Sequence, residues 1–350
     1  MREPRVIVQG FDRPNIFMGV ERFAQEDEKL RALTAAVVEI EKPGIVYVAT
    51  RRRAELVAEA LRAAGVRAEA YHAGRKSAER AAAQQAFMED ATEVMVATTA
   101  FGMGIDKPNV RFVFHYDISD SIDSYYQEIG RAGRDGEPAE ARLFYRPQDL
   151  AIRRFFVGGG QVDADTVAQV ADAVADADGP VALAELRDVT GLSETKLMVA
   201  VHRLQDAGVV ELLPAGEVAP AEIPEDIGAV AEEAVQAQER HRRFERSRLE
   251  MMRGYAENRD CRRRFLLNYF GEDLSDPCGY CDNCEAGLVV TPPRGDEPFP
   301  VGSHVRHTSW GAGQVMRYEG EKIVVLFDEV GYKTMDAALV VERGLLSRES

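Results

Sequence analysis

The chain has 350 residues, of which 45% are hydrophobic and 29% charged, and its formal net charge at pH 7 is -16. The length suits two to four globular domains, and the charge argues against a simple basic nucleic-acid binder. No apolar run is long enough to span a bilayer and no signal peptide is visible, so a cytoplasmic protein without a membrane partner is expected.

The first 157 residues alternate strand-like and helix-like segments. Strands are predicted at Arg5–Gln9, Ile45–Ala49, Ala68–His72, Glu93–Thr98, Phe112–Tyr116 and Ala141–Tyr145. Helices are predicted at Glu26–Ile40, Arg52–Ala64 and Ser77–Met88. This alternation indicates an α/β domain whose parallel sheet is covered by helices on both faces. Because ligands bind such sheets at the carboxyl ends of strands, the loops after the strands are the first candidates for a site.

The loop after Glu93–Thr98 reads TTAFGMGIDKPNV. The hydroxyls of Thr98 and Thr99 stand where the strand ends and are suited to hold phosphate oxygens. Gly102 and Gly104 allow another group to approach the backbone closely, and Asp106 is able to accept a hydrogen bond from a ribose hydroxyl. Taken alone, the same pattern also fits a tight turn between a strand and a helix.

A second candidate loop lies in SYYQEIGRAGRDG, residues 124–136. A helix is expected to end near Gly130 and to be followed by a glycine-rich turn. Arg131 and Arg134 are three residues apart, so both are able to face one anion. A planar, permanently charged guanidinium suits a transferring γ-phosphate. The alternative is two solvated arginines in a turn, and the density of the pattern QxxGRxGR favours the phosphate.

These loops belong to a set of strings that resembles the motifs of superfamily-two helicases, specifically the RecQ family. The strings are FDRPNI at 11–16, GIVYVATRRRAE at 44–55, AYHAG at 70–74, TTAFGMGIDKPNVRFVFHYD at 98–117 and SYYQEIGRAGRDG at 124–136. They occur in the order and spacing of the family and cover about residues 10–155. The resemblance implies that residues 1–157 form the second RecA-like lobe of a helicase motor.

The resemblance also implies roles for the matched positions. Arg134 would be the arginine finger at the γ-phosphate and Arg131 its catalytic neighbour. Nucleotide contact or coupling is implied for Gly104, Asp106 and Gln127. The path of single-stranded DNA is implied to run past Thr50, Arg51, His72, Thr98 and Thr99. Apart from the resemblance, a satisfied histidine at the end of a strand is the favoured interpretation of His72.

The middle of the chain, residues 161–235, is predicted to be a winged-helix-like domain that follows a break at Gly158–Gly160. Residues 181–213 read as a helix, a turn, a second helix with Ser193 as its N-cap, and a short strand. Residues 161–236 contain 16 Asp or Glu and only 3 Lys or Arg. The second helix carries Glu194, Lys196, His202 and Arg203, so DNA contact and packing against protein both stay open.

Four cysteines follow with the spacing Cys261-x16-Cys278-x2-Cys281-x2-Cys284. In a reducing compartment this spacing is typical of a closed, structural metal site. The string CRRRFLLNYFGEDLSDPCGYCDNC resembles the zinc-binding domain of RecQ helicases, which implies that zinc pins a helical hairpin within residues 236–290. Residues 240–264 contain 10 Arg and 4 acidic residues, and contact with DNA phosphates is expected for this run.

The tail, residues 298–350, follows a boundary at Thr291–Gly295 and consists of short β runs broken by glycines. This pattern predicts a small SH3-like barrel, for which protein contact and DNA contact are equally open. Asp328 and Glu329 in IVVLFDEVG look like a magnesium-binding motif, but the string is interpreted as a barrel strand.

No Gly-Lys dipeptide, and therefore no P-loop, occurs in the sequence. The chain is expected to be the C-terminal portion of a 3′-to-5′ ATP-dependent DNA helicase of the RecQ type, inactive without its first RecA-like lobe. That lobe, ATP, Mg²⁺ and single-stranded and partly duplex DNA are the expected partners of a monomer at the bacterial nucleoid. The alternatives are a non-enzymatic DNA-binding or interaction module, and RNA as the substrate.

Overall fold

The computed structural model describes residues 10–102, 105–153, 162–177, 179–213, 216–221, 227–272, 274, 276–289, 297–319 and 321–349. It divides into two compact units, residues 1–153 with 245–350 and residues 154–244. Four sequence features lie outside the described residues: the predicted strand Arg5–Gln9, Gly104, the break Gly158–Gly160 and the boundary Thr291–Gly295.

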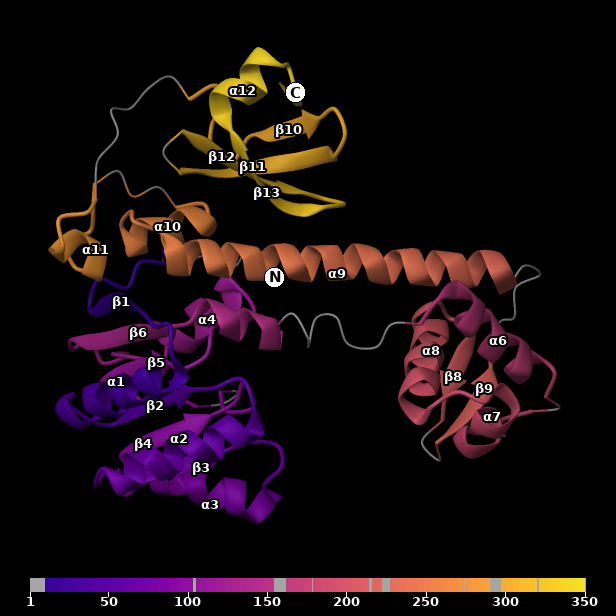
Figure 1. Cartoon of the computed structure of the whole chain (residues 1–350), viewed down its shortest axis with the longest axis horizontal. Helices are drawn as coiled ribbons and strands as arrows, with labels where there is room; N and C mark the ends of the chain where they lie inside the picture. The colour runs from indigo at the N-terminus through magenta and orange to yellow at the C-terminus, as the bar shows by residue number, and fades with distance from the viewer. Residues whose placement is uncertain are drawn as a thin grey trace, which may run out of the picture. The chain divides into compact units, whose positions relative to one another are not determined.

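The first unit contains a six-stranded parallel sheet with the strand order β1-β6-β5-β2-β4-β3 (Figure 1). The strands are β1 (Ile16–Arg22), β2 (Gly44–Tyr47), β3 (Ala68–Tyr71), β4 (Val94–Ala97), β5 (Phe112–His115) and β6 (Ala139–Tyr145). The predicted parallel α/β lobe is therefore confirmed. Strand β1 was not predicted; it lies at one edge of the sheet, where β6 is its neighbouring strand.

Helices cover both faces of this sheet, as predicted. On one face, α1 (Glu26–Glu39) and α2 (Arg51–Ala63) bury apolar side chains against the sheet. On the other face lie α3 (Ser77–Met88) and α4 (Ile122–Ile129). Every residue of β2, β4 and β5 is buried, which is the pattern of central strands covered on two sides. A short 3-10 helix, Pro147–Asp149, follows β6.

The second unit holds a helical core and a small antiparallel sheet. Its elements are α6 (Ala164–Ala175), β7 (Val181–Ala182), α7 (Leu183–Thr190), α8 (Glu194–Asp206), β8 (Val210–Leu212) and β9 (Glu217–Pro220), and the strand order is β7-β9-β8. Gly191 ends α7 with a positive φ of 68°, a conformation that glycine adopts at low cost. The Ser193 side chain accepts from the Lys196 amide, which confirms Ser193 as the N-cap of α8.

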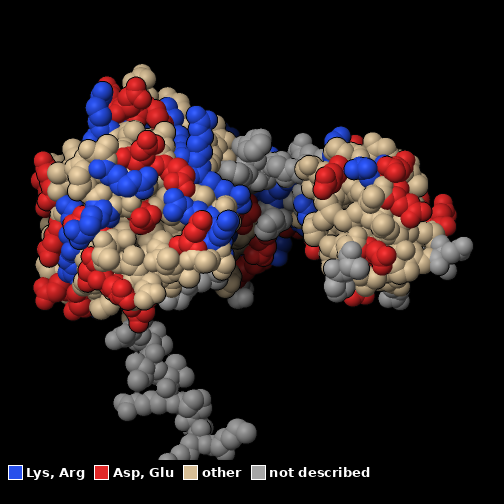
Figure 2. Space-filling view, turned by 90° about the horizontal axis from the view of Figure 1, so that it is seen from below, with Lys and Arg blue, Asp and Glu red and all other residues tan. Residues whose placement is uncertain are grey.

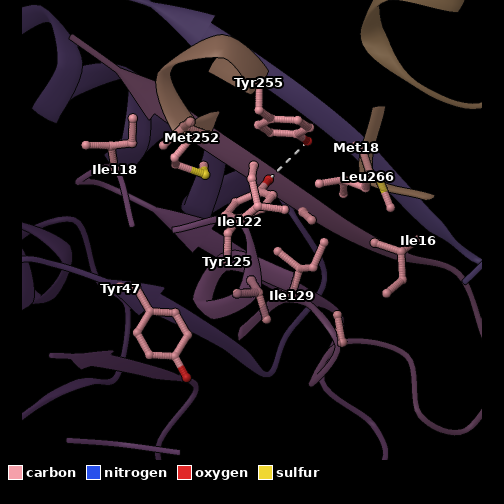
Figure 3. Close-up of a cluster of buried hydrophobic side chains, with 14 of the residues drawn as sticks. Ile16, Met18, Tyr47, Ile118, Ile122, Tyr125, Ile129, Met252, Tyr255 and Leu266 are labelled. Atoms are coloured by element: carbon pink, nitrogen blue, oxygen red, sulfur yellow. Dashed lines mark hydrogen bonds between the residues drawn. The ribbon is translucent and has the colours of Figure 1, made fainter. Parts of the chain in front are cut away.

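Helix α9 (Ile227–Glu257) leads to α10 (Arg262–Tyr269) and α11 (Asp282–Glu285). Cys261 and Cys281 are the N-caps of α10 and α11, Cys284 lies within α11, and Cys278 precedes it. Met252 and Tyr255 of α9 and Leu266 of α10 belong to the same buried cluster as Ile122 and Tyr125 of α4 (Figure 3). The Tyr125 and Tyr255 hydroxyl oxygens lie 3.4 Å apart. The helices of the cysteine module therefore share a hydrophobic core with the sheet.

The tail forms a five-stranded antiparallel sheet with the order β13-β12-β11-β10-β14. Its elements are β10 (His304–His307), β11 (Gly311–Glu319), β12 (Lys322–Phe327), β13 (Gly331–Asp336), α12 (Ala337–Glu342) and β14 (Leu346–Arg348). Asp328 and Glu329 were predicted in a strand, but they lie in the turn between β12 and β13 because pairing ends at Phe327. Among the helices of the described residues, none has the length and apolar character needed to cross a membrane.

Candidate functional site

The two candidate loops predicted from the sequence meet at the carboxyl end of the sheet. We call residues 98–111 the β4 loop and residues 130–137 the arginine loop. Arg131 Nη1 donates to the carbonyl oxygen of Gly102 at 2.6 Å, and Arg134 Nη1 donates to Asp106 Oδ1 at 2.7 Å. Both arginines of the candidate site therefore contact the β4 loop directly.

Arg131 is packed closely against the backbone of the β4 loop. A Cβ atom added at Gly102 would lie 2.5 Å from Arg131 Nη2, so only glycine fits beside this guanidinium without displacing it. The neighbouring Tyr47 hydroxyl donates to the Phe101 carbonyl oxygen at 3.0 Å. Burial, with the charge of Glu128, raises the pKa of Tyr47, so this hydroxyl stays protonated at all physiological pH values.

Arg134 is more accessible than Arg131. Its side chain is 36% exposed and that of its partner Asp106 is 85% exposed. An ion pair this exposed contributes about 0–1 kcal/mol, so an incoming phosphate group is able to replace the carboxylate at little cost. Gln127 is exposed on α4, in the turn before these arginines.

The residues implied for DNA contact lie where β2, β3 and β4 end. These strands are neighbours in the sheet, so their loops share one rim. The Thr50 side chain accepts from the Arg53 amide at 3.2 Å and caps α2. Arg51 is exposed, and its Cδ would lie 3.0 Å from a Cβ added at Gly74. Thr98 is half-buried and Thr99 is exposed in the β4 loop.

His72 has partners inside the chain on both ring nitrogens. Its Nε2 lies 3.0 Å from Glu55 Oε1, and its Nδ1 accepts from the Gly74 amide at 3.2 Å. Burial alone would raise the pKa of Glu55, but hydrogen bonds from His72 and Arg75 outweigh it and lower that pKa. This is the geometry of a satisfied histidine that shapes the loop after β3, and a DNA contact by His72 stays a prediction.

An ionic network beneath the rim escaped the sequence analysis. Lys29 of α1 is fully buried, with its Nζ 2.6 Å from Asp149 Oδ2 and 3.5 Å from Asp117 Oδ1. Arg53 of α2 bonds both carboxylates. Asp117 Oδ2 also accepts from the Ala49 amide at 2.7 Å, which fixes the backbone just before Thr50. Asp117 follows β5, so its place at a strand end was the available signal.

The four cysteines converge on one point. Their Sγ atoms all lie within 4.8 Å of one another. The amides of Arg264 and Cys278 donate to Cys261 Sγ at 3.5 and 3.3 Å, and the amide of Arg262 donates to Cys281 Sγ at 3.4 Å. Hydrogen bonds from the Cys278 and Cys281 thiols lower the pKa of Cys261, and the same pairing raises the pKa of Cys278.

Four thiols this close cannot all ionise unless a cation offsets their charge. Tetrahedral Zn²⁺ with four thiolate ligands meets that requirement and leaves no open position for catalysis. The donor set and its spacing therefore fit a structural zinc ion.

The cysteine module also covers the edge of the parallel sheet. Met18 of β1 forms a parallel bridge with Cys281, and the Val20 amide donates to Asp282 Oδ2 at 2.9 Å. Arg262 Nε holds the other oxygen of Asp282 at 2.9 Å. Unpaired edge strands invite association with other chains, and here residues adjoining the metal site pair with that edge.

The expectation that the arginine run 240–264 contacts phosphates is wrong for its last three members. Arg262, Arg263 and Arg264 are buried, with exposed fractions of 3%, 5% and 8%. They bond carboxylates and carbonyl oxygens within the chain, because a buried guanidinium needs such partners. The exposed arginines of the run are Arg240, Arg243, Arg246, Arg253 and Arg259.

Charge on the surface is mixed rather than uniformly basic. On the face of the first unit in Figure 2, Lys and Arg are interspersed with Asp and Glu. On the same view, the second unit shows mainly uncharged residues, with acidic side chains more evident than basic ones. The face shown therefore presents no uniformly positive surface.

Three family models match separate parts of the chain. Residues 28–136 match the helicase conserved C-terminal domain. Residues 224–285 match the RecQ zinc-binding family. Residues 300–341 match a protein family of unknown function, DUF3553.

Curated relatives agree with the first two matches. The chain is 34% identical over 315 residues to the ATP-dependent DNA helicase RecQ of Pasteurella multocida, which is 90% of this chain and 37% of that protein. It is 30% identical over 284 residues to RecQ of Bacillus subtilis, which is 81% of this chain and 35% of that protein. The chain thus spans little more than a third of these relatives. The chain belongs to the RecQ family of helicases, of which it contains the C-terminal helicase domain and the zinc-binding module.

Proposed function

We propose that this chain supplies the second motor lobe and zinc module of a RecQ-type ATP-dependent DNA helicase that moves 3′ to 5′. The observation that carries the proposal is the junction of the arginine loop with the β4 loop at the carboxyl end of the sheet. A first RecA-like lobe with a P-loop would bind ATP and Mg²⁺, since the 350 residues contain no Gly-Lys dipeptide.

The two arginines have different parts in this proposal. Arg134 is accessible; it forms an ion pair with exposed Asp106 and also donates to the Gly130 and Ile105 carbonyl oxygens at 3.4 Å, and it exchanges the carboxylate for the γ-phosphate when the lobes close. Arg131 keeps the β4 loop in place through the Gly102 carbonyl oxygen and adds positive charge close by. Gly104 and Asp106 contact the nucleotide, and Gln127 on α4 couples the state of the bound nucleotide to DNA binding.

Single-stranded DNA, with partly duplex DNA behind it, runs along the rim formed by the ends of β2, β3 and β4. Thr50, Arg51, Thr98 and Thr99 supply hydroxyls and a charge for its phosphates. Support comes from their common position at neighbouring strand ends. DNA rather than RNA is favoured because this chain matches the RecQ zinc-binding family and its relatives named RecQ are called DNA helicases.

The finer domain assignments belong to the same proposal. We take residues 1–157 as the RecA-like lobe, 161–235 as a winged-helix-like domain, 236–290 as the zinc hairpin and 298–350 as an SH3-like barrel. Support for the second is the succession of α7, α8 and the β8–β9 pair. Support for the fourth is a five-stranded antiparallel sheet with its own core. A monomeric state and a place at the bacterial nucleoid are further parts of the proposal, and the bacterial origin of two relatives supports the bacterial setting.

Fluorescence anisotropy with labelled DNA and RNA of equal length, at one salt concentration, tests the nucleic-acid part. The zinc-loaded chain should prefer DNA, and Arg51→Ala should weaken binding and reduce the salt dependence by about one phosphate contact. Arg67→Ala removes an arginine whose side chain is 63% exposed and serves as the control. Equal affinity for RNA would support the RNA alternative, and an unchanged Arg51→Ala would remove this residue from the DNA path.

A further inference from the structure

The segment FDRPNI, residues 11–16, connects the zinc module with the arginine loop. We call it the connecting segment. The string FDRPNI resembles a motif of the RecQ family, but the proposed ATP and DNA chemistry assigns no role to these residues. It leads into β1, whose first residue is Ile16, and its groups form bonds both with the arginine loop and with the zinc module.

In one direction, the connecting segment holds the backbone of the arginine loop. Arg13 Nη1 donates to the Gly130 carbonyl oxygen at 3.0 Å, and its Nη2 donates to those of Ala132 and Gly133 at 2.7 and 3.0 Å. Asn15 Nδ2 donates to the carbonyl oxygens of Gly133 and Glu137 at 2.8 and 2.9 Å. These five bonds fix carbonyl groups on both sides of Arg131 and Arg134.

The fit at Gly133 is close. This glycine has a positive φ of 56°, and a Cβ atom placed on it would lie 2.4 Å from Asn15 Nδ2. The loop conformation and the position of Asn15 therefore depend on each other.

In the other direction, the zinc module holds the connecting segment. Arg263 Nη2 donates to the carbonyl oxygens of Ile16 and Pro14 at 2.8 and 3.3 Å. The Phe11 ring is stacked on Phe270 with centroids 4.8 Å apart and planes 14° apart. The Phe11 amide donates to Glu272 Oε1 at 2.6 Å. Arg263 lies two residues after the zinc ligand Cys261. Zinc binding at Cys261 therefore fixes the backbone that carries the Arg263 side chain.

The arginine loop is also held by the β4 loop, through contacts that do not involve the connecting segment. Arg111 Nη2 donates to Asp135 Oδ1 at 2.7 Å, and the Gly133 amide donates to the Val110 carbonyl oxygen at 2.8 Å. The arginine loop therefore lies between two supports. In the described part of the chain, the connecting segment is the support for which bonds to the zinc module are seen.

We propose that residues 11–16 are a positioning element through which the zinc module sets the geometry of the arginine loop. Arg263 and the Phe11–Phe270 stack hold the segment, and Arg13 and Asn15 pass its position to the carbonyl groups that flank Arg131 and Arg134. The effect of this coupling on ATP hydrolysis rests on the proposed function. The coupling between the zinc module and the arginine loop does not.

Amide hydrogen exchange on the zinc-loaded chain, without nucleotide or DNA, tests the coupling. Arg13→Ala and Arg263→Ala are each expected to speed exchange of the amides in 130–137 by about tenfold or more, while β2 and β4 keep their protection. Arg13→Lys should restore part of the protection. Arg22→Ala is the matched control, since Arg22 also donates to a backbone carbonyl oxygen across the same two modules, that of Ala256 at 3.2 Å.

Each variant must retain one zinc ion per chain. An effect of Arg13→Ala without an effect of Arg263→Ala would overturn the link to the zinc module. A uniform rise across the lobe, or an equal rise in Arg22→Ala, would show general destabilisation and would also overturn the proposal. The exchange experiment contains no nucleotide, so its result does not depend on whether the arginine loop takes part in ATP hydrolysis. A failure of the coupling is therefore distinguishable from a failure of the proposed function.

Discussion

Arg134 and Asp106 form an ion pair, with Nη1 of the guanidinium 2.7 Å from Oδ1 of the carboxylate. The arginine assigned to the γ-phosphate is therefore held by the β4 loop before any nucleotide arrives. Because both side chains are well exposed, Asp106→Asn should change the free energy of unfolding by less than about 1 kcal/mol. Urea denaturation of the two chains measures this, and a loss of several kcal/mol would show that the pair is structural.

Gly102→Ala should displace Arg131 from the β4 loop. The added Cβ would lie 2.5 Å from Arg131 Nη2, so the guanidinium must shift and lose its bond to the Gly102 carbonyl oxygen. We expect a destabilisation of about 1–3 kcal/mol by thermal unfolding. Gly254→Ala in α9 is the control, because the added Cβ would lie at an ordinary contact distance of 3.8 Å from the Phe265 ring of α10. Equal stability of Gly102→Ala and the wild type would contradict the described packing.

Zinc removal should open the β1 edge of the sheet before it affects the opposite edge. The Val20 amide is held by Asp282, next to Cys281, whereas β3 has no partner in the zinc module among the described contacts. Chelation should therefore raise hydrogen exchange at Val20, while Thr98, whose amide donates to the Tyr71 carbonyl oxygen of β3 at 3.2 Å, keeps its protection. Readdition of zinc should reverse the change. Unchanged exchange at Val20 in the metal-free chain would show that the edge does not depend on the zinc site.

The buried network at Asp149 predicts a defined acid sensitivity. Burial alone would raise the pKa of Asp149, but the hydrogen bond from Arg146 and the charge of Lys29 outweigh it and lower the pKa to about 2. The folded state then has the lower pKa, so the stabilisation is complete above the unfolded pKa of about 4 and is lost as the pH falls toward 2. The lowering corresponds to about 2 kcal/mol.

Asp149→Asn should remove that part of the pH dependence and leave Lys29 buried without one of its two carboxylates. Guanidinium denaturation between pH 2 and pH 5 measures the slope. Glu41→Gln, a change at an exposed residue outside the network, is the control. If Asp149→Asn retained the full acid slope of the wild type, other carboxylates would have to account for it.

Patterns within a few residues predict the centre of this fold well. Strands β2, β4 and β5 are short apolar runs between helix-like segments, and the cysteine spacing specifies the metal site. Strand β1 was missed because Gly19 and Glu21 interrupt its apolar residues. Its strand conformation depends on pairing with β6, more than a hundred residues later.

Charged residues that turn inward were the main failure of the sequence analysis. Arg262, Arg263 and Arg264 read as a phosphate-binding run, but all three are buried against partners in the chain. Arg264 bonds Asp260, four residues earlier, whereas Asp282 and the Ile16 carbonyl oxygen, which bond Arg262 and Arg263, lie 20 and 247 residues away. Lys29 is fully buried for the same reason, since Asp117 and Asp149 reach it from distant segments. No local pattern contains these distant partners. The candidate arginines were found because their loop has a dense motif, whereas the role of Arg13 became visible only through its contacts.

The most direct test of the account is ATP hydrolysis by a two-lobed protein that joins a P-loop lobe to this chain, with saturating single-stranded DNA and Mg²⁺. Arg134→Ala should lower kcat by about a thousandfold or more with DNA affinity retained, Arg67→Ala should be unaffected, and this chain alone should show no turnover. Unchanged kcat in Arg134→Ala, or clear turnover by this chain alone, would contradict the claim that it completes an ATP site built by another lobe.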